Sequence, residues 1–261
     1  MDYPACPKCG HAPLPADQSS PAACPACGIV LAKFGATPVR AVHADAGDDE
    51  PAGFSLADWL FYVPAEVSKL NFYARCAILV AVTLYTVSFF KATDIFYGDI
   101  GGHVLWLLIT PWHEAGHVIF RLFGQFMHIL GGTLMQHLFP IVLGYALLVR
   151  GRNPFGASLC LWLLGYSVIY TAWYMHDAGD PQGMMLNGQS SAESDGHDFI
   201  NIFGYMGGWW LSNATKIGVF VWRIGQGVML AGLAWGAYML WLQKSNLSDA
   251  PFAESPIDRD M

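Results

Sequence analysis

Long apolar runs separated by short polar stretches dominate the chain between residues 71 and 243. About 20 apolar residues suffice for a helix to cross a bilayer. The runs lie at 76–90, 100–120, 122–149, 153–175, 199–214 and 224–242. The run at 122–149 contains Gly131, Gly132 and Pro140, so either one kinked helix or a re-entrant hairpin with a half-span fits it, and the run at 199–214 is short. The pattern predicts an all-α polytopic membrane protein with five or six transmembrane helices.

Polar residues gather toward the two ends of the chain and define its other parts. Residues 1–34 hold four cysteines and form one unit. Residues 35–70 begin as a stretch rich in Ala, Gly, Pro and Asp, typical of a linker, and then carry a helix-start pattern at 55–58. We expect a linker with an interfacial helix at 35–70, a membrane domain at 71–243 and a disordered tail at 244–261.

Composition supports a membrane protein and excludes some partners. Hydrophobic residues make up 54% of the chain and charged residues 13%, and the formal net charge is −7. A nucleic-acid partner would require a broad basic surface, and an acidic chain does not bind anionic headgroups by charge alone. We therefore expect the lipid bilayer as a partner and no nucleic acid. The N-terminus lacks the basic and apolar regions of a cleaved signal peptide.

Cys6, Cys9, Cys24 and Cys27 form two C-x2-C pairs, each followed by glycine. Two such pairs can surround one tetrahedral ion, which predicts a zinc ribbon with structural Zn²⁺; two disulfides or a rubredoxin-like iron site are the alternatives. Reduced thiolates favour the cytoplasm, and the absence of Lys and Arg from 176–198 weakly favours the opposite side for that loop. We expect a cytoplasmic ribbon that docks a protein partner.

The run at 100–120 contains the sequence His113-Glu114-Ala115-Gly116-His117, an H-E-x-x-H motif. On a helix, the two histidines lie one turn apart on the same face and can bind one Zn²⁺, while Glu114 can take a proton from water. An ionisable residue inside a span costs free energy, so Glu114 indicates a functional site. A hydrogen-bonded His/Glu cluster without metal is the alternative.

A catalytic zinc site takes three protein ligands, so a third must come from elsewhere in the chain. Asp177, at the end of a span, is the first candidate, and His197, at the far edge of the polar loop, is the second. His103, His128 and His137 lie in apolar segments, where a histidine is more often a packing residue than a ligand. Cys76 and Cys160 are expected to be small core residues.

The H-E-x-G-H motif within an apolar segment, the following glycine pair and the later aspartate resemble the site-2-protease class of intramembrane zinc metalloproteases, including its divergent bacterial M50-like members. The resemblance covers about residues 100–200. It implies a zinc peptidase with His113 and His117 as ligands, a third ligand from an aspartate, and Glu114 as general base. A membrane-protein segment would be the substrate. In that family the aspartate usually precedes glycine, whereas here Asp177 does not, and the chain's Asp-Gly is at Asp195.

Two other classes of function fit the same residues. One is a non-proteolytic membrane protein that binds a structural metal and recruits a partner through its ribbon. The other is a metal-dependent membrane oxidoreductase or lipid-modifying enzyme, suggested by the seven histidines between 103 and 197. A di-iron enzyme of this kind would need more carboxylates inside the spans than Glu114 alone.

Overall fold

The computed structural model describes residues 4–6, 9–14, 22–27, 31, 56–95, 103–183, 190–192 and 196–249. The chain forms two compact units, Met1–Ala52 and Gly53–Met261. Of the linker and interfacial helix expected at 35–70, residues 35–55 lie outside the described residues. The second unit is helical and contains the apolar runs.

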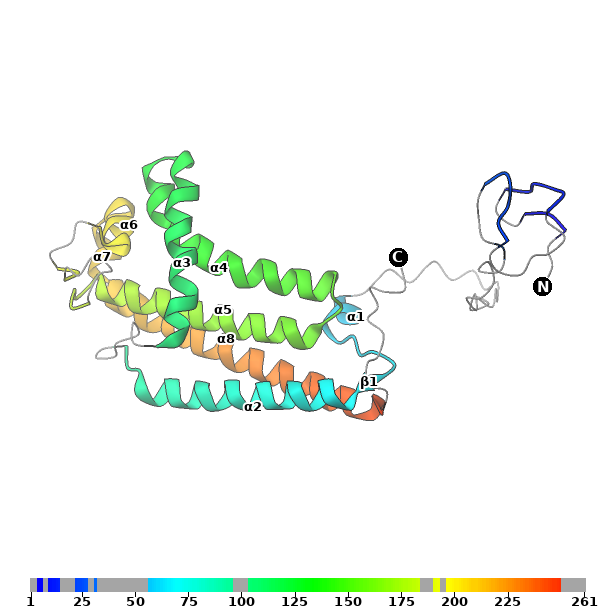
Figure 1. Ribbon diagram of the computed structural model, residues 1–261. Helices are drawn as coiled ribbons and strands as arrows, with labels where there is room; N and C mark the ends of the chain where they lie inside the picture. The colour runs from blue at the N-terminus through cyan, green and yellow to red at the C-terminus, as the bar shows by residue number, and fades with distance from the viewer. Residues whose placement is uncertain are drawn as a thin grey trace, which may run out of the picture. The chain divides into compact units, whose positions relative to one another are not determined.

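Four helices of this unit are long and apolar enough to cross a membrane. They are α2 (Lys69–Ala92), α4 (Gln125–Val149), α5 (Pro154–Asp177) and α8 (Ala214–Gln243). In Figure 1, α2, α5 and α8 run side by side. The closest packing joins α8 to α5, because Gly218, Gly225 and Gly232 recur every seven residues on α8 and meet the α5 backbone, where a Cβ would collide.

The sequence predicted five or six spans, and the described residues contain four. The run at 100–120 forms α3 (Val104–Phe120), whose 17 residues extend about 26 Å, less than the hydrocarbon thickness of about 30 Å. Figure 1 shows α3 running across α5 rather than along it. The run at 199–214 is divided between α6 (Asp198–Met206) and α7 (Gly208–Ser212), because Gly207, at a φ of 110°, ends α6.

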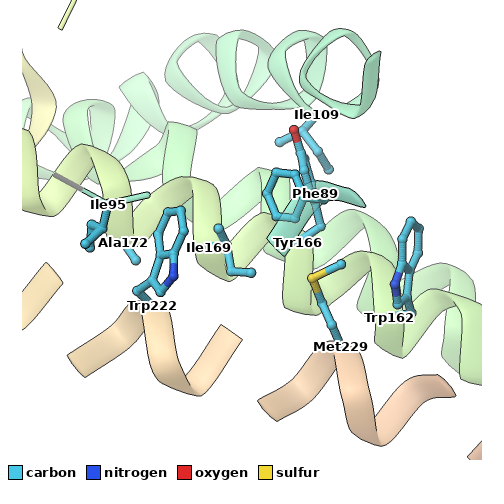
Figure 2. Close-up of a cluster of buried hydrophobic side chains, with 9 residues drawn as sticks. All are labelled: Phe89, Ile95, Ile109, Trp162, Tyr166, Ile169, Ala172, Trp222 and Met229. Atoms are coloured by element: carbon cyan, nitrogen blue, oxygen red, sulfur yellow. The ribbon is translucent and has the colours of Figure 1, made fainter. Parts of the chain in front are cut away.

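The core of the bundle is formed around α5, its most buried helix (Figure 2). Phe89 of α2, Ile109 of α3, and Trp222 and Met229 of α8 pack against Trp162, Tyr166, Ile169 and Ala172 of α5. The Trp162 indole also donates a hydrogen bond of 2.8 Å to the Thr86 hydroxyl on α2. This packing fixes α5 as the element against which α3 and α4 are positioned.

Short elements close the end of the bundle at which α2 begins. The α1 helix (Leu56–Leu60) lies where an interfacial helix was expected. Strand β1 (Val67–Ser68) pairs in parallel with β2 (Leu247–Ser248), and η4 (Lys244–Asn246) precedes β2. The first six residues of the expected tail are therefore ordered, and 250–261 lie outside the described residues. At the far end of α3, the short η3 helix (Arg121–Phe123) connects α3 to α4.

Candidate metal centres

The four N-terminal cysteines converge on one point. The Sγ atoms of Cys6 and Cys27 are 3.6 Å apart and those of Cys9 and Cys24 are 3.8 Å apart, and all four sulfurs lie within 4.8 Å of one another. A tetrahedral zinc ion with Zn–S bonds of about 2.3 Å separates its ligands by about 3.8 Å. The cluster could therefore hold one metal ion.

Without a cation, the thiol form of Cys9 is favoured over the thiolate. A backbone hydrogen bond at His11 favours the thiolate of Cys9, but the neighbouring thiols of Cys27 and Cys6 oppose it and raise the pKa of Cys9 to about 12. Several thiolates in so small a volume repel one another unless a positive ion lies between them.

Replacing Cys24 with Ser is expected to release this ion, because three thiolates no longer close the tetrahedron. Metal analysis of the purified full chain should show one ion fewer, and the N-terminal unit should become sensitive to protease, since so short a segment depends on its metal for folding. Cys160, buried in α5, supplies the matched control. Cys160→Ser should keep the wild-type metal content; an unchanged content in Cys24→Ser would contradict the metal assignment.

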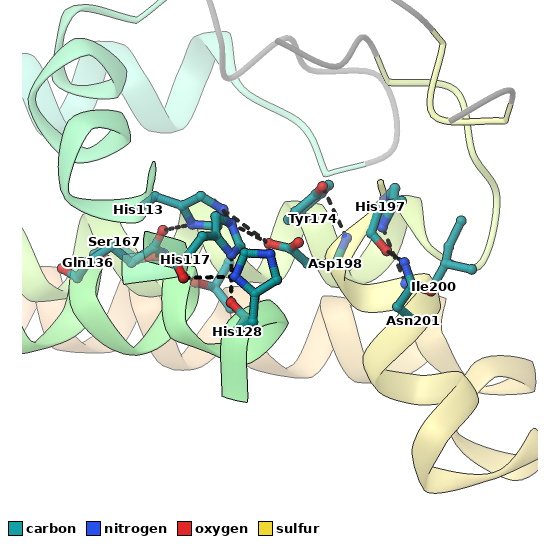
Figure 3. A network of polar contacts seen from close by, with 11 residues as sticks. His113, His117, His128, Gln136, Ser167, Tyr174, His197, Asp198, Ile200 and Asn201 are labelled. Atoms are coloured by element: carbon teal, nitrogen blue, oxygen red, sulfur yellow. Dashed lines mark hydrogen bonds and ion pairs between the residues drawn. The ribbon is translucent and has the colours of Figure 1, made fainter. Parts of the chain in front are cut away.

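A second group of possible ligands lies in the helical unit and joins residues of two helices (Figure 3). His113 and His117 are one turn apart on α3, and their Nε2 atoms are 3.1 Å apart. The Oδ2 atom of Asp198, the first residue of α6, lies 3.1 Å from His113 Nε2 and 3.4 Å from His117 Nε2. Zinc with bonds of about 2.0 Å in tetrahedral geometry separates its N and O ligands by about 3.3 Å. The three atoms are thus spaced as ligands of one ion.

The Nδ1 atoms of His113 and His117 make hydrogen bonds that orient the two Nε2 atoms toward this group. Nδ1 of His113 is 2.8 Å from the side-chain oxygen of Gln136, and Nδ1 of His117 is 2.8 Å from the backbone carbonyl of His128. The Gln136 orientation is set by its NH₂ group, which donates to the Thr171 hydroxyl at 2.6 Å and the Ser167 carbonyl at 3.3 Å. A carbonyl oxygen only accepts, so both Nδ1 atoms donate, and in the neutral form of each ring the Nε2 atom carries a lone pair directed into this group.

With both rings neutral, three acceptors face one another in a buried space, which is favourable only with a positive charge among them, either a metal ion or a proton on a histidine. Burial lowers the pKa of His117, but the hydrogen bond and charge of Asp198 raise it to about 9, so a proton takes this place when no cation is bound. Asp198 is buried, and burial alone would favour its neutral form, but the hydrogen bonds and charges of His113 and His117 hold the pKa of Asp198 below its ordinary value. The donor set, two imidazoles and one carboxylate, is one that zinc takes in catalytic sites. The residues present therefore fit a metal ion.

Glycines allow α3 and α4 to approach closely enough to form this group. Gly116, within the motif, packs directly on Gly131, and a side chain at either position would collide with the backbone of the other helix. A Cβ at Gly132 would lie 2.6 Å from His117 Nε2. His128 and His117 reinforce the contact, because the Nδ1 atom of His128 is 2.7 Å from the His117 carbonyl and each imidazole donates to the other's backbone. The glycine pair therefore makes room for the histidines.

The two residues predicted from the sequence as third ligand, Asp177 and His197, do not join this group. They pair with each other: Nε2 of His197 lies 3.1 Å from Oδ2 of Asp177. The Nδ1 atom of His197 accepts a hydrogen bond from the Ile200 amide at the start of α6, so both ring nitrogens are engaged. Asp177 also accepts two backbone hydrogen bonds of 2.8 Å, from Gln182 and Gly183. Asp198, and neither of these two residues, lies within reach of both histidines and could be the third ligand.

Asp177 and His197 nevertheless contribute to the site by fixing the residue next to them. The buried pair anchors the chain immediately before Asp198 to the end of α5. Tyr174, one turn before Asp177, accepts a hydrogen bond of 3.3 Å from the Asp198 amide, and its ring centroid lies 4.2 Å from that of His197. These contacts set the direction in which the Asp198 carboxylate points.

The remaining residues of interest occupy different surroundings. Glu114 is exposed on α3, next to the buried His113. His137 bonds the Thr171 hydroxyl at 3.3 Å, and His103 packs edge-on against Phe89, so both contact the core rather than the ligand group. No family model, no curated protein and no solved structure matches this chain, so the site is assigned from the geometry of its own residues.

Proposed function

We propose that this protein is a membrane-embedded zinc metallopeptidase that hydrolyses peptide bonds of membrane proteins. The observation that carries the proposal is the convergence of His113, His117 and Asp198 beside Glu114: three acceptor atoms spaced for one ion, with a glutamate next to the first ligand. The four helices long enough to cross a membrane support a membrane-protein substrate.

Each residue has a distinct role in this proposal. His113, His117 and Asp198 hold the zinc, and Gln136 and the His128 carbonyl fix the tautomers of the two histidines. A zinc ion held by these residues would supply Lewis-acid chemistry for the attacking water and the peptide carbonyl. Glu114 accepts the proton of the attacking water and returns it to the leaving amine. The cluster of four cysteines, which leaves no open coordination position, acts as a structural zinc ribbon that recruits a protein partner.

One observation favours a second function. Two histidines and one carboxylate with open positions also form the ligand set of non-haem iron oxygenases, so a membrane oxidoreductase fits the same three residues. Glu114 distinguishes the two classes. The peptidase needs it to transfer a proton, whereas the oxygenase reaction does not.

Metal exchange separates these possibilities. The purified full chain in proteoliposomes would be stripped with a chelator, reloaded with Zn²⁺ or with Fe²⁺ under air, and mixed with detergent-solubilised single-span membrane proteins. We expect new N-termini with Zn²⁺ alone, detected by N-terminal labelling and mass spectrometry, and none before reloading. Oxidised products with Fe²⁺ and no new N-termini with Zn²⁺ would support the oxygenase instead.

A further inference from the structure

Basic side chains lie at two levels on the long helices. We call the level at which α2 begins and α8 ends the lower tier, and the level at which α2 ends and α8 begins the upper tier. The segments of α2 and α8 between the tiers, 76–90 and 224–243, contain no charged residue. The lower tier consists of Arg75, Arg150, Arg152 and Lys244, and the upper tier consists of Lys91 and Arg223.

Contacts between helices bring the members of the lower tier to one end of the bundle. Arg75 donates a hydrogen bond of 2.8 Å to Gln243, the residue before Lys244. Arg152 lies three residues before Phe155 of α5, which packs on the last turns of α8. The beginnings of α2 and α5 and the end of α8 are therefore level with one another.

Contacts with α5 also place the two members of the upper tier at a common level. Lys91 lies two residues after Phe89, whose ring centroid is 5.3 Å from that of Tyr166 on α5. Arg223 lies two residues before Gly225, which packs on the same turn of α5. Because α8 runs opposite to α2 and α5, both cations lie level with the turn of α5 that follows Tyr166.

The separation of the two tiers matches the hydrocarbon layer of a bilayer. The 16 residues from Arg75 to Lys91 correspond to about 24 Å of helix, and the 21 residues from Arg223 to Lys244 correspond to about 32 Å, against a hydrocarbon thickness of about 30 Å. Lysine and arginine near the ends of a span extend toward the headgroups. The tiers therefore have the spacing of the two headgroup layers.

The candidate metal ligands lie level with the upper tier. Gln136, which bonds His113, also bonds Thr171 of α5, and Tyr174 accepts a hydrogen bond from the Asp198 amide. The α3 helix, which carries the two histidines, crosses α5 instead of running along it (Figure 1). The ligand group therefore lies beside the last two turns of α5, at the end of the uncharged part of the bundle and not at its middle.

Glu114 independently favours this level. Its side chain is exposed, and among the described residues no lysine or arginine forms an ion pair with it. An ionised carboxylate is costly against hydrocarbon, whereas water reaches it in a headgroup layer. Asp180 and Lys216, which lie further toward the same end of α5 and α8, are exposed as well.

We propose that the candidate metal centre lies in the headgroup layer at the end of the bundle where α2 ends, and that it takes the part of a substrate chain just outside the bilayer instead of a segment within the hydrocarbon. A backbone inside hydrocarbon must keep its helical hydrogen bonds, whereas in the headgroup layer it can be extended and hydrated. The choice of substrate rests on the proposed peptidase function, but the depth of the site does not.

Lipids that carry a spin label at a known depth measure the position of the ion. The purified full chain would be stripped with a chelator, reloaded with Co²⁺ and placed in nanodiscs whose phosphatidylcholine carries a nitroxide either at the headgroup or near the end of an acyl chain. Asp198→Ala, treated in the same way, gives the contribution of the four-cysteine cluster, which is subtracted. Co²⁺ should enhance relaxation of the headgroup nitroxide about tenfold more than that of the chain-end nitroxide, because about 15 Å of hydrocarbon separates the two.

Cleavage of a single-span membrane protein provides the second readout. Its apolar span would be flanked on both sides by linkers rich in Gly and Ser, and new N-termini formed by the Zn²⁺-loaded chain would be located by mass spectrometry. We expect them within about five residues outside one end of the span, and none at its centre.

The two readouts separate the placement of the site from the function proposed for it. Stronger relaxation of the headgroup nitroxide without cleavage would support the placement and contradict the peptidase. Cleavage at the centre of the span, or equal or stronger relaxation of the chain-end nitroxide, would overturn the placement, and any cleavage that depends on Zn²⁺ would retain the peptidase. Identical relaxation in wild type and Asp198→Ala would show that these ligands hold no ion and would overturn both.

Discussion

Glu114→Gln is expected to lower the rate of peptide hydrolysis by a factor of about 10² to 10⁴ while the membrane domain keeps its metal. The amide has nearly the same shape as the carboxylate but cannot accept a proton, and positioned general bases contribute rate factors of this size. Glu114 is exposed and is not one of the three converging ligands, so its replacement leaves the ligand atoms in place. The measurement is kcat for cleavage, together with metal content per chain.

A second Glu→Gln variant tests whether the loss of any acidic side chain lowers activity. Glu66 is also exposed and lies just before β1, at the end of the unit where α2 begins. Glu66→Gln should retain wild-type kcat and metal content. Full activity in purified Glu114→Gln protein would refute the role of Glu114 in proton transfer, whereas loss of metal in that variant would make Glu114 a structural residue.

Asp198→Ala is expected to remove the metal ion of the membrane domain almost completely. The two histidines would remain, but a site with two protein ligands binds zinc far more weakly than one with three, and the carboxylate supplies the negative charge among them. Wild-type protein should contain two ions per chain, one in each cluster, and Asp198→Ala should contain one. Hydrolysis should disappear together with the ion.

Two other aspartates discriminate between direct ligation and positioning. Asp177→Asn loses the charged acceptor for His197 but leaves the ligands of the metal unchanged, so affinity for Zn²⁺ should fall about 10- to 100-fold and the ion should return at higher zinc concentration. Asp180→Asn changes an exposed acid of the same region and should behave as wild type. If Asp177→Asn cannot be refilled and Asp198→Ala can, Asp177 is the ligand that the sequence first suggested.

The parts of the site that were predictable from sequence are those formed by neighbouring residues. The i, i+4 spacing of His113 and His117 places both imidazoles on one face of any helix, and the C-x2-C pairs place two thiols on one turn. The structure shows both sets as clusters that could hold a metal ion. The helical character of the membrane domain followed from the apolar runs alone, because their length decides whether a helix can cross a bilayer.

The third ligand was not predictable in the same way, because it depends on how a loop returns to the bundle. Asp177 and His197 are attractive in sequence as polar residues near a span end, yet they satisfy each other. Asp198 follows His197 directly and lies in the first turn of α6. Acidic residues are common at the start of a helix, so the sequence did not mark Asp198 as a ligand. The sequence also predicted more spans than the four long apolar helices of the described residues. An apolar run such as the 17 residues of α3 forms a helix whether or not it crosses a membrane.

Pro140 gives the metal site a mechanical connection to the helix bundle. Proline has no amide hydrogen to donate, so the carbonyl of Gln136, four residues earlier, loses its helical partner and accepts a hydrogen bond from the Ser167 hydroxyl of α5 at 3.3 Å. The side chain of the same glutamine orients His113. A shift of α5 along α4 would therefore move both ends of Gln136 and turn the ring of His113, so the packing of these two helices sets the orientation of that histidine.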